Sequence, residues 1–229
     1  MPVHIHPTAL LAPRALLPDD PGRALALAQL VLDEPRMFNH NRGLWGYTGT
    51  AADGEPLTIQ STGIGGPSAA VVMEELCDLG LRRAIRVGAC AALASGLALG
   101  ELVVVDGVLP GDGASRALGA ASRVAADGDL VAALRAAAGG RVRTGAVASS
   151  DLFYDPVHAR VRAWADAGAL AVDLEAAALL RVAELRGVQA GCLLAVGDVV
   201  EDGRRRRIEP EALDVAADRL GEVAAAALA

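Results

Sequence analysis

The sequence predicts one α/β domain in which a sheet is covered by helices on both faces. Short apolar runs alternate along the chain with helical patterns, the order typical of strand and helix units. The expected strands are apolar throughout, as in a sheet buried on both faces. The chain has 229 residues, 53% of them hydrophobic, enough for one ordinary core but cramped for two full domains. Residues 1–229 are therefore expected to form a single domain.

Each element follows from its local pattern. A strand at 57–62 enters a glycine-rich turn at 63–67, and a helix at 68–79 follows with Ser68 as its N-cap. Further apolar strands are expected at 84–88, 102–109, 142–148, 169–174 and 191–199. Helices are expected after residues 17–24, at 129–138, at 156–166 with Pro156 in the first turn, at 175–186 and at 210–228. Residues 111–128 and 199–208 are expected to be loops.

Charge and composition exclude several classes of function. The net charge is −7 and the isoelectric point is about 5.1, which argues against a nucleic-acid-binding protein. All 21 basic residues are arginine, so chemistry that needs a catalytic lysine is excluded. No apolar run is long enough to span a membrane, and the N-terminus lacks the basic start of a secretory signal. We therefore expect a cytoplasmic protein without a membrane partner.

Cysteine and histidine usage argues against disulfides and metals. The three cysteines are widely spaced and odd in number, which predicts reduced, mostly buried thiols. His4 and His6 have the spacing of half a metal site, but no second pair with ligand spacing follows. No metal site is predicted.

Charged residues next to apolar strands are the first candidates for a functional site. Asp19 and Arg23 stand at the start of a helix. Two interpretations are open: backbone N–H groups and Arg23 bind an anion there, or the carboxylate only caps the helix. Arg86 lies inside an apolar strand, near its expected carboxyl end, and needs either a buried partner or a ligand. Asp173 and Glu175 flank a strand-to-helix junction, where one caps the helix or both grip two vicinal hydroxyls.

Two further segments add an acid and an aromatic face. Asp198 closes a buried strand, and a desolvated aspartate has a raised pKa that suits a general acid. Phe153 and Tyr154 follow another strand, where they either stack on a planar ligand or pack in the core.

Together these segments resemble the nucleoside phosphorylase family, which includes bacterial purine nucleoside phosphorylase and uridine phosphorylase. The similarity runs in order over nearly the whole chain and is strongest at residues 38–49, 63–68, 85–88 and 172–177. The resemblance implies a twisted, partly barrel-like mixed sheet with flanking helices. It also implies cleavage of the N-glycosidic bond of a nucleoside by inorganic phosphate as co-substrate, with no metal or organic cofactor.

The resemblance assigns roles residue by residue. The phosphate site would be Arg23, Arg42 and Arg86; the ribose site would be His4, Leu174 and Glu175; the base site would be Phe153, Tyr154 and Val172. Asp198 would protonate or hydrogen-bond N7 of a purine, with an arginine of 204–207 as a further candidate. In the family, the residues matching His4 and Arg42 come from a neighbouring subunit. The resemblance therefore implies a homo-oligomer, with a dimer as minimal unit and a hexamer expected.

This chain departs from the family pattern mainly at the phosphate site. Asp19 stands where the family has Gly, Ala89 where it has Ser or Thr, and Ala91 where it has Gly. Elsewhere, Gly197 replaces a Ser, and Asp173 and Leu174 replace Glu and Met.

The leading interpretation is a purine-type phosphorylase that yields free base and pentose 1-phosphate. Asp198 and the absence of a Gln-x-Arg at 157–159 favour purines over pyrimidines. A nucleosidase that uses water is the first alternative, favoured by Asp19 and Ala89. A nucleoside-binding homologue with impaired catalysis is the second, favoured by the number of replacements.

Overall fold

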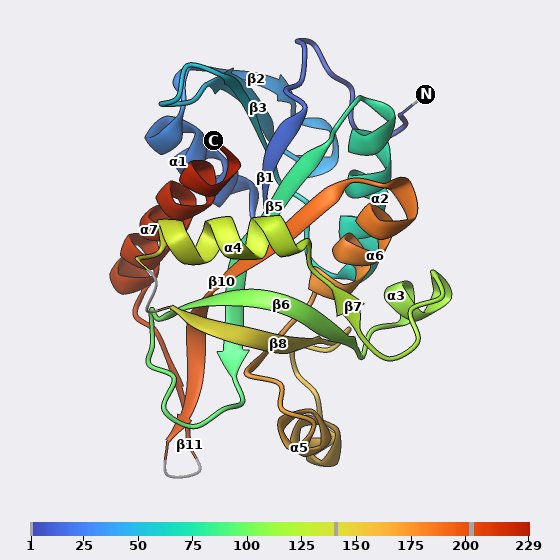
Figure 1. Ribbon diagram of the computed structural model, residues 1–229, viewed down its shortest axis with the longest axis vertical. Helices are drawn as coiled ribbons and strands as arrows, with labels where there is room; N and C mark the ends of the chain where they lie inside the picture. Colours follow the sequence, from blue (N-terminus) through green and yellow to red (C-terminus); the bar gives the residue numbers. More distant parts are fainter. Residues whose placement is uncertain (1, 140–141, 202–203) are drawn as a thin grey trace.

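The structure, a computed structural model, describes residues 2–139, 142–201 and 204–229, and its strands form one continuous mixed sheet (Figure 1). The strand order is β11-β10-β6-β8-β9-β5-β1-β4-β3-β2, with β7 beside β6. The strands are β1 (Arg14–Pro18), β2 (Asp33–Asn39), β3 (Gly46–Thr50), β4 (Pro56–Gln60), β5 (Arg83–Ala92), β6 (Leu102–Pro110), β7 (Val124–Ala125), β8 (Arg143–Ser149), β9 (Ala171–Asp173), β10 (Gln189–Glu201) and β11 (Arg204–Arg207).

Half of this sheet closes on itself. Strand β5 pairs with β9 and also runs parallel to β10, so β10, β6, β8, β9 and β5 form a ring. Strands β1, β4, β3 and β2 continue from β5 as an open sheet. The partly barrel-like mixed sheet implied by the family resemblance is therefore confirmed. A register shift between Val196 and Asp198 bends β10 where it passes the end of β5.

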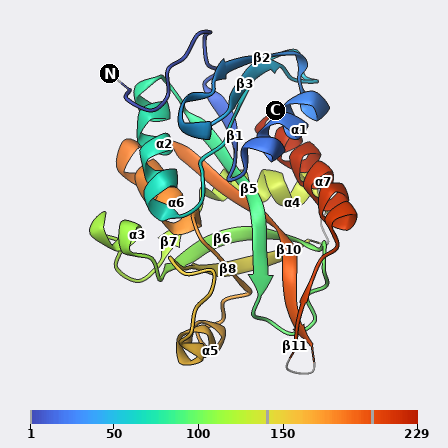
Figure 2. The ribbon, with the colours of Figure 1, turned by 180° about the vertical axis from the view of Figure 1, so that it is seen from behind.

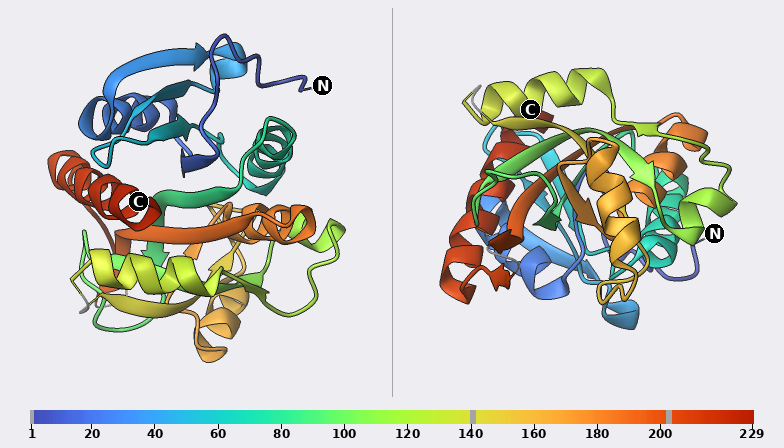
Figure 3. Two further views of the ribbon diagram at one scale, coloured as in Figure 1. Left: turned by 45° about the horizontal axis from the view of Figure 1, so that its top comes forward. Right: turned by 90° about the horizontal axis from the view of Figure 1, so that it is seen from below.

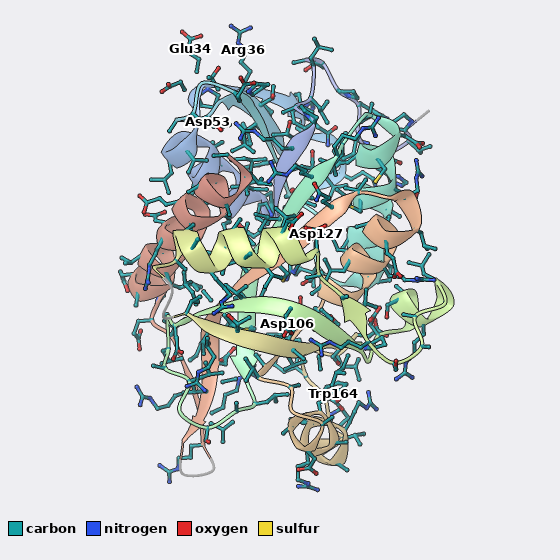
Figure 4. All side chains as sticks on the ribbon, viewed as in Figure 1. Glu34, Arg36, Asp53, Asp106, Asp127 and Trp164 are labelled. Atoms are coloured by element: carbon teal, nitrogen blue, oxygen red, sulfur yellow. The ribbon has the colours of Figure 1, made fainter. Side chains whose placement is uncertain are left out.

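Helices cover both faces of the sheet. They are α1 (Pro21–Val31), α2 (Gly66–Asp78), α3 (Gly113–Ala117), α4 (Gly128–Ala137), α5 (His158–Asp166), α6 (Ala176–Arg186) and α7 (Pro210–Leu228), with a short 3-10 turn at Asn41–Gly43. Helices α1, α4 and α7 pack on one face and α2 and α6 on the other, as the views from the front, behind, top and below show (Figures 1, 2 and 3). Asp127 caps α4 by accepting from the N–H groups of Asp129 and Leu130 (Figure 4).

The central strands are buried on both faces, as their continuous apolar runs predict, whereas β11 and most of β2 are exposed. Leu193 belongs to the core beneath α1, α4 and α7, whereas the next residue, Leu194, belongs to the core beneath α2 and α6. Successive side chains of a strand point to opposite faces, so β10 separates two cores. All three cysteines are buried, as predicted. None of the helices described has the length and apolar character that crossing a membrane would require.

Several expectations about local structure are wrong. Ser68 does not cap α2, because the helix begins at Gly66 with Gly65 as N-cap, and the Ser68 hydroxyl donates to the carbonyl of Thr62. Arg86 lies in mid-strand, because β5 continues to Ala92. Pro156 does not stand in the first turn of α5, which begins at His158.

The two expected loops contain regular structure. Residues 111–128 include α3 and β7, and part of 199–208 forms the end of β10 and strand β11. Strands β1, β2 and β3 have no counterpart among the expected elements. The exposed, polar β2 is an edge strand held by pairing with β3.

Candidate functional site

The centre of the site is a buried arginine held by two carboxylates. Arg86 of β5 is 1% exposed, and its Nε donates to Oδ2 of Asp173 at 3.0 Å. Its Nη2 donates to Oε2 of Glu175 in a short contact. Its Nη1 is buried and has no partner among the described residues. Of the two alternatives that the sequence left open for Arg86, a buried partner or a ligand, the structure shows two buried partners, and one donor remains without a partner among the described residues.

The two carboxylates come from the junction between β9 and α6. Asp173 is the last residue of β9, and Glu175 is the residue before α6. Oδ2 of Asp173 also accepts from the backbone N–H of Ala176 at 2.9 Å, so Asp173 is the residue of this pair that caps the helix with its side chain. The other oxygen of Glu175, Oε1, accepts from the N–H of Gly65 at 2.7 Å. Gly65 has a φ of +90°, which favours glycine, and this brings the turn at 63–67 to the site.

Burial dominates the electrostatics of Glu175. It raises the pKa of Glu175 to about 7, against the lowering effect of the Arg86 charge. The negative charges of Asp173 and Asp19 raise it further, and the N–H of Gly65 lowers it. A carboxyl group with this pKa exchanges its proton near neutral pH.

Asp19 and Arg23 lie beside this centre. Oδ1 of Asp19 accepts from Nη1 of Arg23 at 3.4 Å, a long hydrogen bond between two partly exposed groups. Burial alone would lower the pKa of Arg86, but the carboxylates of Glu175, Asp173 and Asp19 raise it above its ordinary value. Asp19 is therefore within electrostatic reach of Arg86, as the family resemblance implies. The Asp20 side chain caps α1 through the N–H of Arg23 at 2.7 Å.

A second cluster surrounds Asp198 on β10. Both oxygens of Asp198 accept from Arg205 of β11, each at 3.0 Å, and Asp198 is 6% exposed. The Arg205 guanidinium lies 4.7 Å from the centre of the Phe153 ring, and that of Arg207 lies 5.6 Å from it. Phe153 meets Tyr154 edge to face at 4.9 Å. One arginine thus connects the expected acid to the expected base-stacking residue.

The two clusters lie on neighbouring strands of the ring, β10 and β9, which flank β5. Asp198 is opposite Ala91 of β5, and Ala91 is opposite Val172 of β9. Burial raises the pKa of the Cys90 thiol, and the charges of Asp173, Arg86 and Asp198 all act on it. Val172 and Leu174 are half-buried on either side of Asp173. The fold therefore brings Asp198 of β10, Ala91 of β5 and Val172 of β9 side by side, and Asp173 connects β9 to Arg86.

His4 and Arg42 lie apart from this centre, on a common surface. The His4 ring nitrogen Nδ1 is 2.7 Å from Oε1 of Glu75 in α2, and the His4 carbonyl accepts from Asn41 at 3.0 Å. Arg42, in the same turn as Asn41, is exposed and has a φ of +55°. Among residues 2–139, 142–201 and 204–229, no hydrogen bond or ion pair joins Arg42 to another side chain.

A cavity of about 350 Å³ opens on this surface between Arg42, His6 and His40. The described part of the chain thus carries His4 and Arg42 next to each other but does not bring them to Arg86. None of the described residues form a cluster of three side chains suited to a metal ion.

Three contacts of the site were not anticipated from the sequence. They are the N–H of Gly65 on Glu175, the Ser149 hydroxyl on Asp173 at 2.5 Å, and the specific pairing of Arg205 with Asp198. Ser149 directly follows the strand expected at 142–148 and is the last residue of the observed β8, and this place at a strand end is its sequence signal.

The arrangement offers complementary chemistry in a small space. The open Nη1 of Arg86 and the guanidinium of Arg23 can donate hydrogen bonds to an anion. Glu175 offers carboxylate oxygens that accept from vicinal hydroxyls, and Phe153 offers an aromatic face. Asp198 offers a further carboxylate, held by the arginine that lies over Phe153. Such groups can bind an anion, a ligand with hydroxyl groups and a planar ring.

Comparison with known proteins shows the family to which the chain belongs. Residues 13–229 match the family model described as the phosphorylase superfamily. The chain is 34% identical to guanosine phosphorylase of Halorubrum lacusprofundi over 84% of this chain and 80% of that protein. It is 30% identical to a DeoD-type purine nucleoside phosphorylase of Clostridium beijerinckii over 97% and 99%, respectively. It is 35% identical to uridine phosphorylase of Treponema pallidum over 79% and 75%.

The chain therefore belongs to the phosphorylase superfamily, and the resemblance carried by its motifs is confirmed.

Proposed function

We propose that the protein cleaves the N-glycosidic bond of a purine nucleoside with inorganic phosphate, giving free base and pentose 1-phosphate. The observation that carries this proposal is the buried Arg86, with an unpartnered donor, beside Glu175. An open cationic donor next to a carboxylate suits a phosphate placed against a ribose. The names of the relatives from Halorubrum and Clostridium support nucleosides of purines as substrates.

In this proposal, phosphate binds to Arg86 and Arg23, and Glu175 accepts from the ribose 2′ and 3′ hydroxyls. A phosphate oxygen attacks C1′ while the bond from C1′ to N9 breaks, and its electron pair goes to the base. Leu174 lines the ribose, and Phe153, Tyr154 and Val172 hold the base. No metal or organic cofactor takes part.

Asp198 assists departure of the base at N7. In the resting site both of its oxygens accept from Arg205, the arrangement of an ionised carboxylate. To donate a proton to N7, Asp198 must carry that proton and release at least one bond from Arg205. A purine stacked on Phe153 would displace Arg205 from the ring face and so loosen this pair.

A second copy of the chain would complete the site. The exposed Arg42 and the adjacent His4, which lack contact with Arg86, support donation of both residues to a neighbouring subunit. We propose a dimer as the minimal unit, a hexamer as the assembly, and a cytoplasmic role in nucleoside salvage. The three buried thiols suit that compartment.

Hydrolysis by water is the second candidate, and the contact between Asp19 and Arg23 favours it. A carboxylate at that position repels phosphate and competes for Arg23. The third candidate, binding of a nucleoside without turnover, has less support because Asp198 and Glu175 are both retained.

The test is a panel of purine and pyrimidine nucleosides incubated with and without phosphate. Free base and pentose 1-phosphate are both followed. The variant Arg86→Met, purified in the same way, controls for contaminating phosphorylases. Release of base only with phosphate supports phosphorolysis, and equal release without it supports hydrolysis. No release from any nucleoside, with binding retained, supports the third candidate.

A further inference from the structure

The Asp173 side chain has more hydrogen-bond partners than capping the N-terminus of α6 requires. Its carboxylate is fully enclosed, and Oδ2 accepts from Arg86 Nε, from the N–H of Ala176 and, at 3.2 Å, from the N–H of Glu175. Oδ1 accepts from the Ser149 hydroxyl at 2.5 Å. The same hydroxyl accepts from the N–H of Ala177 at 2.9 Å. The N-terminus of α6 and Ser149 therefore fix the position of the Asp173 carboxylate against Arg86.

This fixed carboxylate determines which edge of Arg86 is open. A guanidinium has a side edge formed by Nε and one terminal nitrogen, and an end edge formed by its two terminal nitrogens. Asp173 and Glu175 close the side edge through Nε and Nη2. Nη1 alone has no partner among the described residues, so an anion can approach only from the end edge.

The two carboxylates on Arg86 differ in how firmly they are held. Asp173 is tied by one hydroxyl and two backbone N–H groups besides Arg86. The Glu175 carboxylate has, besides Arg86, a single described hydrogen bond, from the N–H of Gly65. If Glu175 turns to a ligand, Asp173 still neutralises Arg86, and no unpaired charge is left in the core.

We propose that Asp173 is a positioning residue that permanently neutralises and orients Arg86, so that Glu175 is free to leave it for the ribose and the end edge of Arg86 is presented to phosphate. This role rests on the proposed function, in which Arg86 binds phosphate. Asp173 itself touches neither substrate. Without its charge, Arg86 would turn toward Glu175, the one carboxylate left, and both phosphate and ribose would lose a partner.

The principal variant is Asp173→Asn, which keeps the shape but removes the charge. The matched control is Ser149→Ala, which removes a hydrogen bond from the same carboxylate and from α6 without touching Arg86. We expect Asp173→Asn to raise the phosphate KM about tenfold or more, with kcat at saturating phosphate reduced less than about threefold. We expect Ser149→Ala to lower Tm and to raise the phosphate KM clearly less than Asp173→Asn does, because two backbone N–H groups of α6 still hold the charged Asp173 against Arg86.

Two further variants keep the test decisive. Asp173→Glu retains the charge and is expected to restore most of the phosphate affinity that the Asn variant loses. If Asp173→Asn does not fold, Asp173→Ser replaces it, because serine still caps a helix but cannot neutralise Arg86. Its phosphate KM is expected to rise by a similar factor.

The result that overturns this role is a phosphate KM that Asp173→Asn and Ser149→Ala change equally, or that neither changes. The variant Arg86→Lys separates this failure from failure of the proposed function. If Arg86→Lys raises the phosphate KM but Asp173→Asn does not, only the positioning role is wrong. If Arg86→Lys leaves the phosphate KM unchanged, the phosphate site itself is wrong, and the role of Asp173 with it.

Discussion

Removing the negative charge of Asp19 is expected to strengthen phosphate binding. In the structure this carboxylate pairs with Arg23 at 3.4 Å and acts electrostatically on Arg86 and Glu175. A phosphate bound between the two arginines would therefore be repelled by Asp19 and would compete with it for Arg23. The substitution Asp19→Asn removes both effects with little change in volume.

The size of the effect follows from the distance and the exposure. Two unit charges about 4 Å apart interact by roughly 4 kcal/mol at an effective dielectric constant near 20. The Asp19 side chain is 26% exposed, so solvent reduces this value. The net penalty on phosphate binding is about 1–3 kcal/mol, a factor of about 5 to 150 in affinity. Adding the hydroxyl of Ala89→Ser contributes roughly 0.5–1.5 kcal/mol more.

The assay is the phosphate concentration dependence of base release. The parent, Asp19→Asn, and the double variant Asp19→Gly with Ala89→Ser are compared. Asp20→Asn is the matched control, because Asp20 is the next residue, is exposed, and directs its oxygen to the N–H of Arg23 at the start of α1. We expect the phosphate KM to fall in the two Asp19 variants and to change less than about twofold in the control.

Two results would refute this reasoning. One is a parent already saturated at micromolar phosphate, which means that Asp19 imposes no penalty. The other is an equal shift in Asp19→Asn and Asp20→Asn, which means that only net charge matters. Base release independent of phosphate in every form would instead support the nucleosidase.

Three further predictions concern the acid, the buried carboxyl and the assembly. Asp198→Asn is expected to lower kcat by about 10²–10⁴ and to weaken nucleoside binding less, measured by steady-state kinetics; unchanged kcat on every substrate contradicts the acid role. Because burial raises the pKa of Glu175 from 4.5 to about 7, the folded state holds a proton that the unfolded chain releases. The stabilisation from the protonated Glu175 is complete below about pH 4.5 and is lost as the pH rises through 7. Glutamine does not titrate, so the Tm of Glu175→Gln should rise relative to that of the parent between pH 5 and 8. A Tm difference that stays constant with pH contradicts this prediction. Light scattering at micromolar concentration should show at least a dimer, and a uniform monomer contradicts the shared site.

Much of the fold follows from the sequence because its signals are local. The predicted C-terminal helix has the observed bounds Pro210–Leu228, and the apolar runs at 84–88, 102–109 and 191–199 all lie within strands. A strand buried on both faces must be apolar, so its sequence reports its burial directly. Strand β2 escaped prediction because its exposed residues carry no such pattern, and it is extended only because β3 pairs with it.

The candidate residues of the site were also found from the sequence, but their partners were not. A charge in an apolar strand is costly, so Arg86 by itself predicts a counter-ion. That the counter-ions are Asp173 and Glu175, 87 and 89 residues away, depends on the pairing of β9 with β5. The bond from Ser149 to Asp173 likewise depends on β8 running parallel to β9.

The sequence by itself thus determined which side chains are buried, and hence which of them need partners. Only the tertiary structure decided which partners they have and which donor of Arg86 stays open. The physical reason is that the local order of apolar and polar residues determines which side chains are buried. Contact between distant residues depends instead on the register and closure of a sheet whose strands, β10, β6, β8, β9 and β5, are far apart in the chain.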